Sequence, residues 1–220
     1  LVLPPDHKPG QRHPLVIVQY GSEGFLRGGT GDEVPIQPLA ARGFAVLSFD
    51  RPDLLPEAYR ATTEAEMRTL NSDPWADRRQ VHSSLEMAID RAVATGAVDA
   101  NKVGISGFSD GSSTVQFALL NSDRFKAASI SSCCEDMYSF ALAAGPYFTD
   151  SLREVRYRYF ENDMETFWEP MSLIHNADKL DVPILVQNAD SEYEGGLDVI
   201  EALTHHGKAI ELYVFPGEPH

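Results

Sequence analysis

A serine stands between two glycines in the stretch Gly107 to Gly111 (GFSDG), after an apolar segment and before a segment with helical periodicity. A serine in a tight turn between a strand and a helix exposes its hydroxyl, and a Cβ at either glycine would clash with nearby backbone. The start of the following helix offers N–H groups and a positive dipole end to developing negative charge. The pattern predicts that Ser109 is the nucleophile of a hydrolase. A serine between two glycines also arises by chance, so this prediction depends on the strand expected before the serine and the helix expected after it.

A serine hydroxyl needs a base that takes its proton and an acid that orients the base. Asp190 follows the apolar segment 182–188, and His220 follows the apolar segment 210–216, so the chain order is serine, acid, histidine. We assign His220 as the general base and then acid, and Asp190 as the carboxylate that fixes the imidazole tautomer.

Other residues compete for these two roles. Asp190 could instead cap a turn, with Glu192 or Asp198 as the orienting acid. The remaining histidines fall in an opening loop, in a helix, on an apolar segment or at a helix end, where a structural or solvated role is expected. These are His7, His13, His82, His175, His205 and His206.

The oxyanion of a tetrahedral intermediate needs hydrogen-bond donors. The backbone N–H of Asp110, directly after the nucleophile, is one donor by position. Tyr20, at the end of the segment 14–20, is a candidate for the second. On the residues alone, a buried structural tyrosine is the commoner reading.

Short apolar segments rich in β-branched and aromatic residues alternate with helical patterns. We expect helices over about 74–95 (capped by Asp73), after Ser109 as far as about Leu120, and over 196–206. The expected strands are 14–20, 44–50, 102–108, 127–133, 182–188 and 210–216. This alternation predicts an α/β fold with a mostly parallel sheet and helices on both faces, in which functional residues gather beyond the carboxyl ends of the strands.

The segment 135–170 interrupts this alternation and is rich in aromatic residues. It could pack over the sheet, wall an apolar substrate pocket, or do both. Our candidates for such a pocket are Cys133, Tyr157, Tyr159 and Trp168.

Composition excludes several classes of function. The formal net charge is −15, with 33 acidic and 18 basic residues, so nucleic acid is an unfavourable partner. No apolar run approaches the roughly 18 residues of a membrane span, and no phosphate-loop or metal-ligand motif occurs, so we infer no membrane segment and no cofactor. The only two cysteines, Cys133 and Cys134, are adjacent and are expected to be small buried apolar side chains.

Longer stretches resemble the catalytic α/β-hydrolase domain of the prolyl oligopeptidase family of serine peptidases, over nearly all of residues 1–220. They are LVLPPDHKPGQRHPLVIVQYG, PLAARGFAVLSFDRP, VDANKVGISGFSDGSSTVQFALLNSDRFKAASISSC and YVFPGEPH. The resemblance implies hydrolysis of a peptide bond through an acyl-enzyme, with Ser109, Asp190 and His220 as triad, and a Tyr20 hydroxyl that donates to the oxyanion. It also implies an N-terminal β-propeller in a longer protein, as a partner domain of this one.

The chain departs from the family pattern in two places. Ser112 stands where a second glycine is usual, and Gln187-Asn188 replaces the usual His-Gly before a shorter acid loop, which leaves both Asp190 and Glu192 open as the acid. Within the family, GFSDGSSTV is similar to the lasso-peptide isopeptidases, which open the side-chain amide that closes the ring of a lasso peptide. A peptide substrate, such as a lasso peptide, is therefore expected; an esterase that acts on small esters is the alternative.

Overall fold

The computed structural model describes most of the chain. The described residues are 1–19, 35–49, 52, 57, 60–72, 74–132, 134–218 and 220.

One six-stranded sheet forms the centre of the molecule, with the strand order β2-β1-β3-β4-β5-β6. Every pair of neighbouring strands is parallel. The strands are β1 (His13–Gln19), β2 (Ala45–Ser48), β3 (Val98–Phe108), β4 (Phe125–Ser131), β5 (Ile184–Ala189) and β6 (Ile210–Phe215). The six expected strands and the parallel sheet are confirmed, with ends that differ by a few residues.

Helices connect the strands, as parallel neighbours require. They are α1 (Ile36–Ala41), α2 (Glu64–Ser72), α3 (Ala76–Ala94), α4 (Asp110–Asn121), α5 (Met137–Ala143), α6 (Pro146–Glu154), α7 (Met164–Trp168) and α8 (Leu197–His205), with short 3-10 turns η3 (Ala177–Lys179) and η4 (Tyr193–Gly196). The three predicted helices correspond to α3, α4 and α8. Asp73, the expected N-cap of the first of these helices, lies outside the described residues. That helix, α3, begins after Trp75.

The two faces of the sheet are covered by different helices because alternate residues of a strand point to opposite faces. On β1, Leu15 and Ile17 belong to the main core together with Leu85 of α3. Val18, one position further, packs instead with Ile36 of α1. Helices therefore cover both faces, as the sequence predicts.

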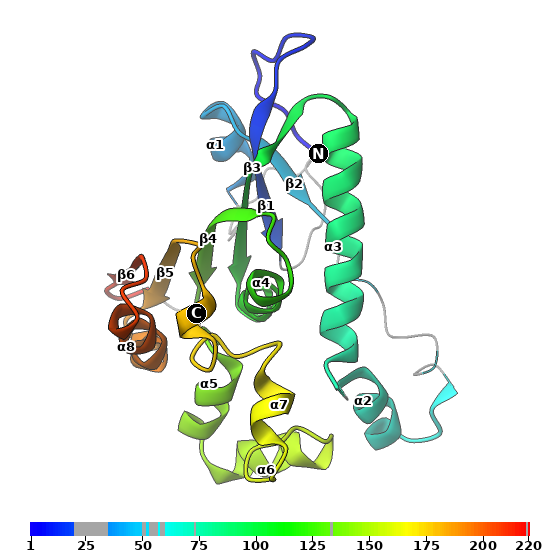
Figure 1. Cartoon of the computed structure of the whole chain (residues 1–220), viewed down its shortest axis with the longest axis vertical. Helices are drawn as coiled ribbons and strands as arrows, with labels where there is room; N and C mark the ends of the chain where they lie inside the picture. Colours follow the sequence, from blue (N-terminus) through cyan, green and yellow to red (C-terminus); the bar gives the residue numbers. More distant parts are fainter. Residues whose placement is uncertain are drawn as a thin grey trace.

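The aromatic segment forms a second, smaller core beyond the carboxyl ends of the strands. In Figure 1 the arrows of β1 and β3 point toward the side where α5, α6 and α7 lie. This core buries nine side chains: Trp75, Phe117, Ala141, Val155, Tyr157, Tyr159, Phe167, Trp168 and Met171. Trp75 stands just before α3, and its contact with Trp168 joins the N-terminal end of that helix to the aromatic segment.

The large rings of this core are buried, and their polar groups find partners inside the protein instead of facing a ligand. Trp168 is 0% exposed and its indole N–H donates to the carbonyl of Arg158. The Tyr159 hydroxyl donates to the carbonyl of Met137 over 3.3 Å, and Tyr157 is also buried. The prediction that Tyr157, Tyr159 and Trp168 line a substrate pocket is wrong, because these large rings bury their apolar surface against one another.

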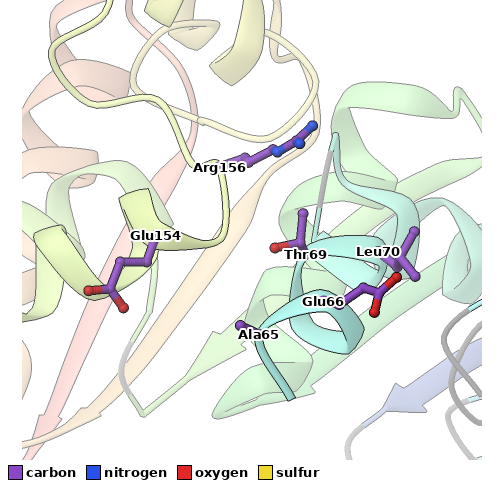
Figure 2. A pocket seen from close by; sticks show the side chains of 6 residues that line it. All are labelled: Ala65, Glu66, Thr69, Leu70, Glu154 and Arg156. Carbon is purple, nitrogen blue, oxygen red and sulfur yellow. The ribbon is translucent and has the colours of Figure 1, made fainter. Parts of the chain in front are cut away.

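The surface near this core carries a hollow of about 490 Å³ between α2 and the end of α6. Figure 2 shows Arg156 extending from the loop after α6 toward the side of α2. The lining residues are Ala65, Glu66, Thr69, Leu70, Glu154 and Arg156.

Among the described residues, no helix combines the length and the apolar character needed to cross a membrane.

Replacing Trp168 tests the second core. We expect Trp168→Ala to lower the local stability of the segment α5 to α7 by about 3–5 kcal/mol, because a cavity and an unpaired carbonyl replace the indole. Hydrogen exchange of the peptides covering residues 137–168, in the full-length protein, measures this loss. Phe160→Ala is the matched control, because Phe160 is 70% exposed. Equal protection in the two variants would contradict this account.

Candidate active site

Ser109 alone joins β3 to α4. The strand ends at Phe108 and the helix begins at Asp110, which leaves one residue for the whole change of direction. Ser109 takes φ 53° and ψ −124°, a backbone conformation that costs a non-glycine residue about 1–3 kcal/mol. Its N–H donates to the carbonyl of Ser131 on β4 over 2.9 Å, which holds the strained turn against the sheet. The predicted strand-to-helix turn is present.

The neighbouring glycines are needed for close backbone contacts. A Cβ on Gly107 would collide with the carbonyl of Gly111, and a Cβ on Gly111 would collide with the carbonyl of Gln19 at the end of β1. The hydroxyl of Ser112 lies 3.3 Å from the carbonyl oxygen of Gly107 and 3.1 Å from that of Ser131. The serine that replaces a second glycine thus ties α4 to the ends of β3 and β4.

The histidine that closes the described chain lies beside the serine. Nε2 of His220 is 3.1 Å from Oγ of Ser109, and Nδ1 is 2.6 Å from Oε1 of Glu192. The imidazole ring also packs beside Phe108, with ring centroids 5.3 Å apart. Its side chain is 47% exposed. One continuous chain of hydrogen bonds therefore runs from the serine hydroxyl to a carboxylate.

That carboxylate is Glu192, and the prediction of Asp190 in this place is wrong. Asp190 is exposed, and its Oδ2 accepts a hydrogen bond from the N–H of Gly217 over 2.8 Å. It therefore ties the turn after β5 to the turn after β6. Glu192 follows two residues later, where its N–H donates to the carbonyl of Ala189 over 3.1 Å, and its longer side chain reaches the imidazole. The shortened acid loop of the sequence is the signal that left this alternative open.

An arginine that the sequence analysis missed holds the residue after Ser109. Arg78 of α3 is 5% exposed, and both of its terminal nitrogens contact the carboxylate of Asp110, one of them over 3.2 Å. Burial by itself lowers the pKa of Arg78, but the carboxylates of Asp110 and Asp77 raise it more, so the guanidinium stays charged. Arg79, the next residue of the same helix, is exposed.

The donors expected for an oxyanion are described in part. Asp110 begins α4, directly after Ser109, so its N–H lies at the positive end of the helix dipole. Tyr20 and the pocket candidate Cys133 lie outside the described residues. Cys134 is disulfide-bonded, so the expectation of a plain apolar side chain is wrong there.

The other histidines make structural contacts. His82 is half-buried in α3, where burial lowers its pKa, and His205 is the last residue of α8. His175 packs against Tyr138, with ring centroids 4.7 Å apart. Within the described part of the chain, no three His, Cys, Asp or Glu side chains are grouped so that they could hold a metal ion.

A curated protein is similar to the whole of this chain. The chain is 44% identical to the lasso peptide isopeptidase AtxE2 of Asticcacaulis excentricus over 220 residues, which are all of this chain and 32% of that protein. It thus spans about a third of the length of this relative.

Solved structures also match the fold of this chain. A serine-to-alanine variant of the AtxE2 isopeptidase with Astexin3-dC4 bound matches with a TM-score of 0.87 and 44% identity, over 98% of this chain and 33% of that one. The acylaminoacyl peptidase of Pyrococcus horikoshii matches with a TM-score of 0.66 and 18% identity, over 96% of this chain and 33% of that one, and supports the fold alone. The fold is that of the α/β-hydrolases, as expected.

The family itself follows from a direct match. The model of the prolyl oligopeptidase family matches residues 81–220, which include the serine turn, the acid loop and the histidine. This chain belongs to the prolyl oligopeptidase family.

Proposed function

We propose that this chain is the catalytic part of an isopeptidase that opens the ring-closing amide of a lasso peptide through an acyl-enzyme. The observation that carries the proposal is the hydrogen-bond chain from Ser109 through His220 to Glu192, set on a strained turn. The substrate class rests on the relative at 44% identity, whose name is lasso peptide isopeptidase. In sequence order, the triad is Ser109, Glu192 and His220.

The first half-reaction acylates the serine. Ser109 Oγ attacks the amide carbon while Nε2 of His220 takes the hydroxyl proton. This requires the imidazole tautomer in which Nδ1 is protonated and Nε2 is not. Glu192 selects this tautomer because its carboxylate accepts a hydrogen bond of 2.6 Å from the Nδ1–H. The Glu192 carboxylate then stabilises the imidazolium that forms.

The tetrahedral intermediate carries negative charge on the former carbonyl oxygen. The N–H of Asp110 at the start of α4 is the first donor, and the positive end of the helix dipole adds to it. Arg78 fixes the side chain of Asp110 and so keeps this donor in place. The hydroxyl of Tyr20 is proposed as the second donor, from the family resemblance.

Collapse of the tetrahedral intermediate completes the acylation. The C–N bond breaks as His220 gives its proton to the leaving amine, which frees the amino group that closed the ring. In the second half-reaction, water attacks the carbonyl carbon of the acyl-enzyme while His220 takes one of the water's protons. The ester bond to Ser109 Oγ then breaks, and His220 returns that proton to the serine. One water is consumed per bond, and the products are a carboxylate and an amine.

The wider organisation is part of the proposal. Residues 1–220 form one α/β-hydrolase catalytic domain, and the whole protein carries a β-propeller N-terminal to it. The share of the relative that this chain covers, 32%, leaves room for such a domain.

The nucleophile is tested first. In the full-length protein, Ser109→Ala should lower turnover of a lasso peptide by at least about 10³-fold, because no other hydroxyl occupies the turn. Mass spectrometry measures the mass gain of one water in the peptide. A fluorophosphonate should label the wild type at Ser109 and leave the variant unlabelled. Turnover retained by the variant, or cleavage of a nitrophenyl ester without cleavage of lasso peptides, would contradict the proposal.

The two acids form a matched pair of variants. Glu192→Gln should lower kcat by about 10²–10⁴-fold, because an amide no longer selects the reactive tautomer or stabilises the imidazolium. Asp190→Asn keeps an acceptor for the Gly217 N–H and should change kcat less than about threefold. Steady-state kinetics on the same peptide compares them. The opposite ranking would make Asp190 the catalytic acid.

Arg78 and its neighbour Arg79 form a second pair. Arg78→Met should lower both the melting temperature and kcat, because it leaves the carboxylate of Asp110 without its buried partner, at a cost of about 1–3 kcal/mol, since the Asp110 side chain is 40% exposed. Arg79→Met, on the exposed face, should change neither. Adding Asp110→Asn to Arg78→Met should restore part of the stability, as removal of both charges costs less than removal of one. Identical melting of the two single variants would sink this role.

A further inference from the structure

A second carboxyl group lies buried next to the acid of the proposed triad. Glu135 follows β4 and is 0% exposed. The turn η4, which directly follows Glu192, passes over it. A Cβ on Gly196 would lie 3.4 Å from both Cγ and Cδ of Glu135, and one on Gly195 would lie 3.9 Å from Oε2. Because Gly195 and Gly196 have no side chains, the turn that follows Glu192 packs directly against Glu135.

Asn188 of β5 shares the same space. A Cβ on Gly196 would also lie 3.4 Å from Nδ2 of Asn188, whose side chain is buried. Both oxygens of Glu135, both polar atoms of Asn188 and Oε2 of Glu192 are buried, and none makes a hydrogen bond of ordinary geometry in the described part of the chain. Buried polar groups in this state destabilise a fold, so their concentration at one place calls for an explanation.

The surroundings of Glu135 raise its pKa and so favour its neutral form. Burial raises the pKa of Glu135, the amide of Asn188 lowers it in part, and the charge of Glu192 raises it further. Glu192 faces His220, and its side chain is 19% exposed. A neutral Glu135 carries a hydroxyl donor, and the buried acceptors in this cluster are Oδ1 of Asn188 and Oε2 of Glu192.

We propose that Glu135 is a positioning residue for Glu192. Together with Asn188, its buried carboxyl supports the segment Glu192–Gly196 from below and holds Glu192 with Oε1 toward Nδ1 of His220. Glu135 itself touches neither the serine nor the imidazole in the described contacts. The inference rests on the proposed function, since it takes Glu192 as the acid of the triad.

A double-mutant cycle in the full-length protein tests this role. Two readouts are used: kcat on a lasso peptide, and the rate at which a fluorophosphonate labels Ser109, which needs no peptide. Glu135→Leu should lower both by about 10–100-fold with KM little changed, because the orienting acid loses its support. Glu135→Gln should stay within about threefold of the wild type, because its amide offers a donor and an acceptor as a neutral carboxyl does.

The coupling to Glu192 separates positioning from general destabilisation. In a Glu192→Gln background, Glu135→Leu should cause no further loss in either rate, because the group that it positions is already disabled. Thr149→Val is the control for loss of a buried hydrogen bond elsewhere, as Thr149 donates to the carbonyl of Ala141 over 2.9 Å, and it should leave both rates unchanged.

The outcomes decide between the proposals. Equal losses from Glu135→Leu in both backgrounds, or a loss in Glu135→Gln as large as in Glu135→Leu, would overturn the positioning role. If Glu135→Leu does not fold, Glu135→Asp replaces it, because the carboxyl then withdraws by one methylene, and the same coupling is expected. Labelling that slows about tenfold in Glu135→Leu, in an enzyme that leaves lasso peptides intact, would support positioning and overturn only the substrate assignment.

Discussion

The turn at Ser109 is the constraint on which the rest of the site depends. A single residue connects a strand to a helix, and it does so in a backbone conformation that serine disfavours. The surrounding backbone compensates, since carbonyls of β1 and α4 lie so close to Gly107 and Gly111 that neither position has room for a Cβ. The strain is thus held by packing within the sheet, and it leaves the hydroxyl facing His220 rather than pairing within the turn.

The positions of the three residues of the proposed triad follow from the sheet. β3, β5 and β6 are parallel, so their carboxyl ends meet at one edge, and the serine, the acid and the histidine each follow one of these strands. The order of the elements was therefore predictable from short apolar segments between helical patterns. So was the role of the glycines, because a crowded turn excludes side chains whatever the rest of the fold is.

Side-chain reach was harder to predict. Asp190 and Glu192 both follow β5, and their ranking depends on how the chain turns after Ala189, which no local pattern fixes. Arg78 escaped notice because a charged residue in a helix is usually solvated, whereas here the carboxylate of Asp110 compensates its burial. The aromatic rings of 135–170 had two readings, and Tyr157, Tyr159 and Trp168 follow the packing one because their polar atoms are satisfied inside the segment or buried with it.

In the proposed mechanism, Ser109, His220 and Glu192 act as one unit while the N–H of Asp110 receives the oxyanion. A crystal structure of the full-length enzyme after reaction with a fluorophosphonate tests this arrangement. We expect phosphorus bonded to Oγ of Ser109, a phosphonyl oxygen within hydrogen-bond distance of the Asp110 N–H, and Nδ1 of His220 still bonded to Glu192. An adduct on another residue, or an imidazole turned to Asp190, would contradict it.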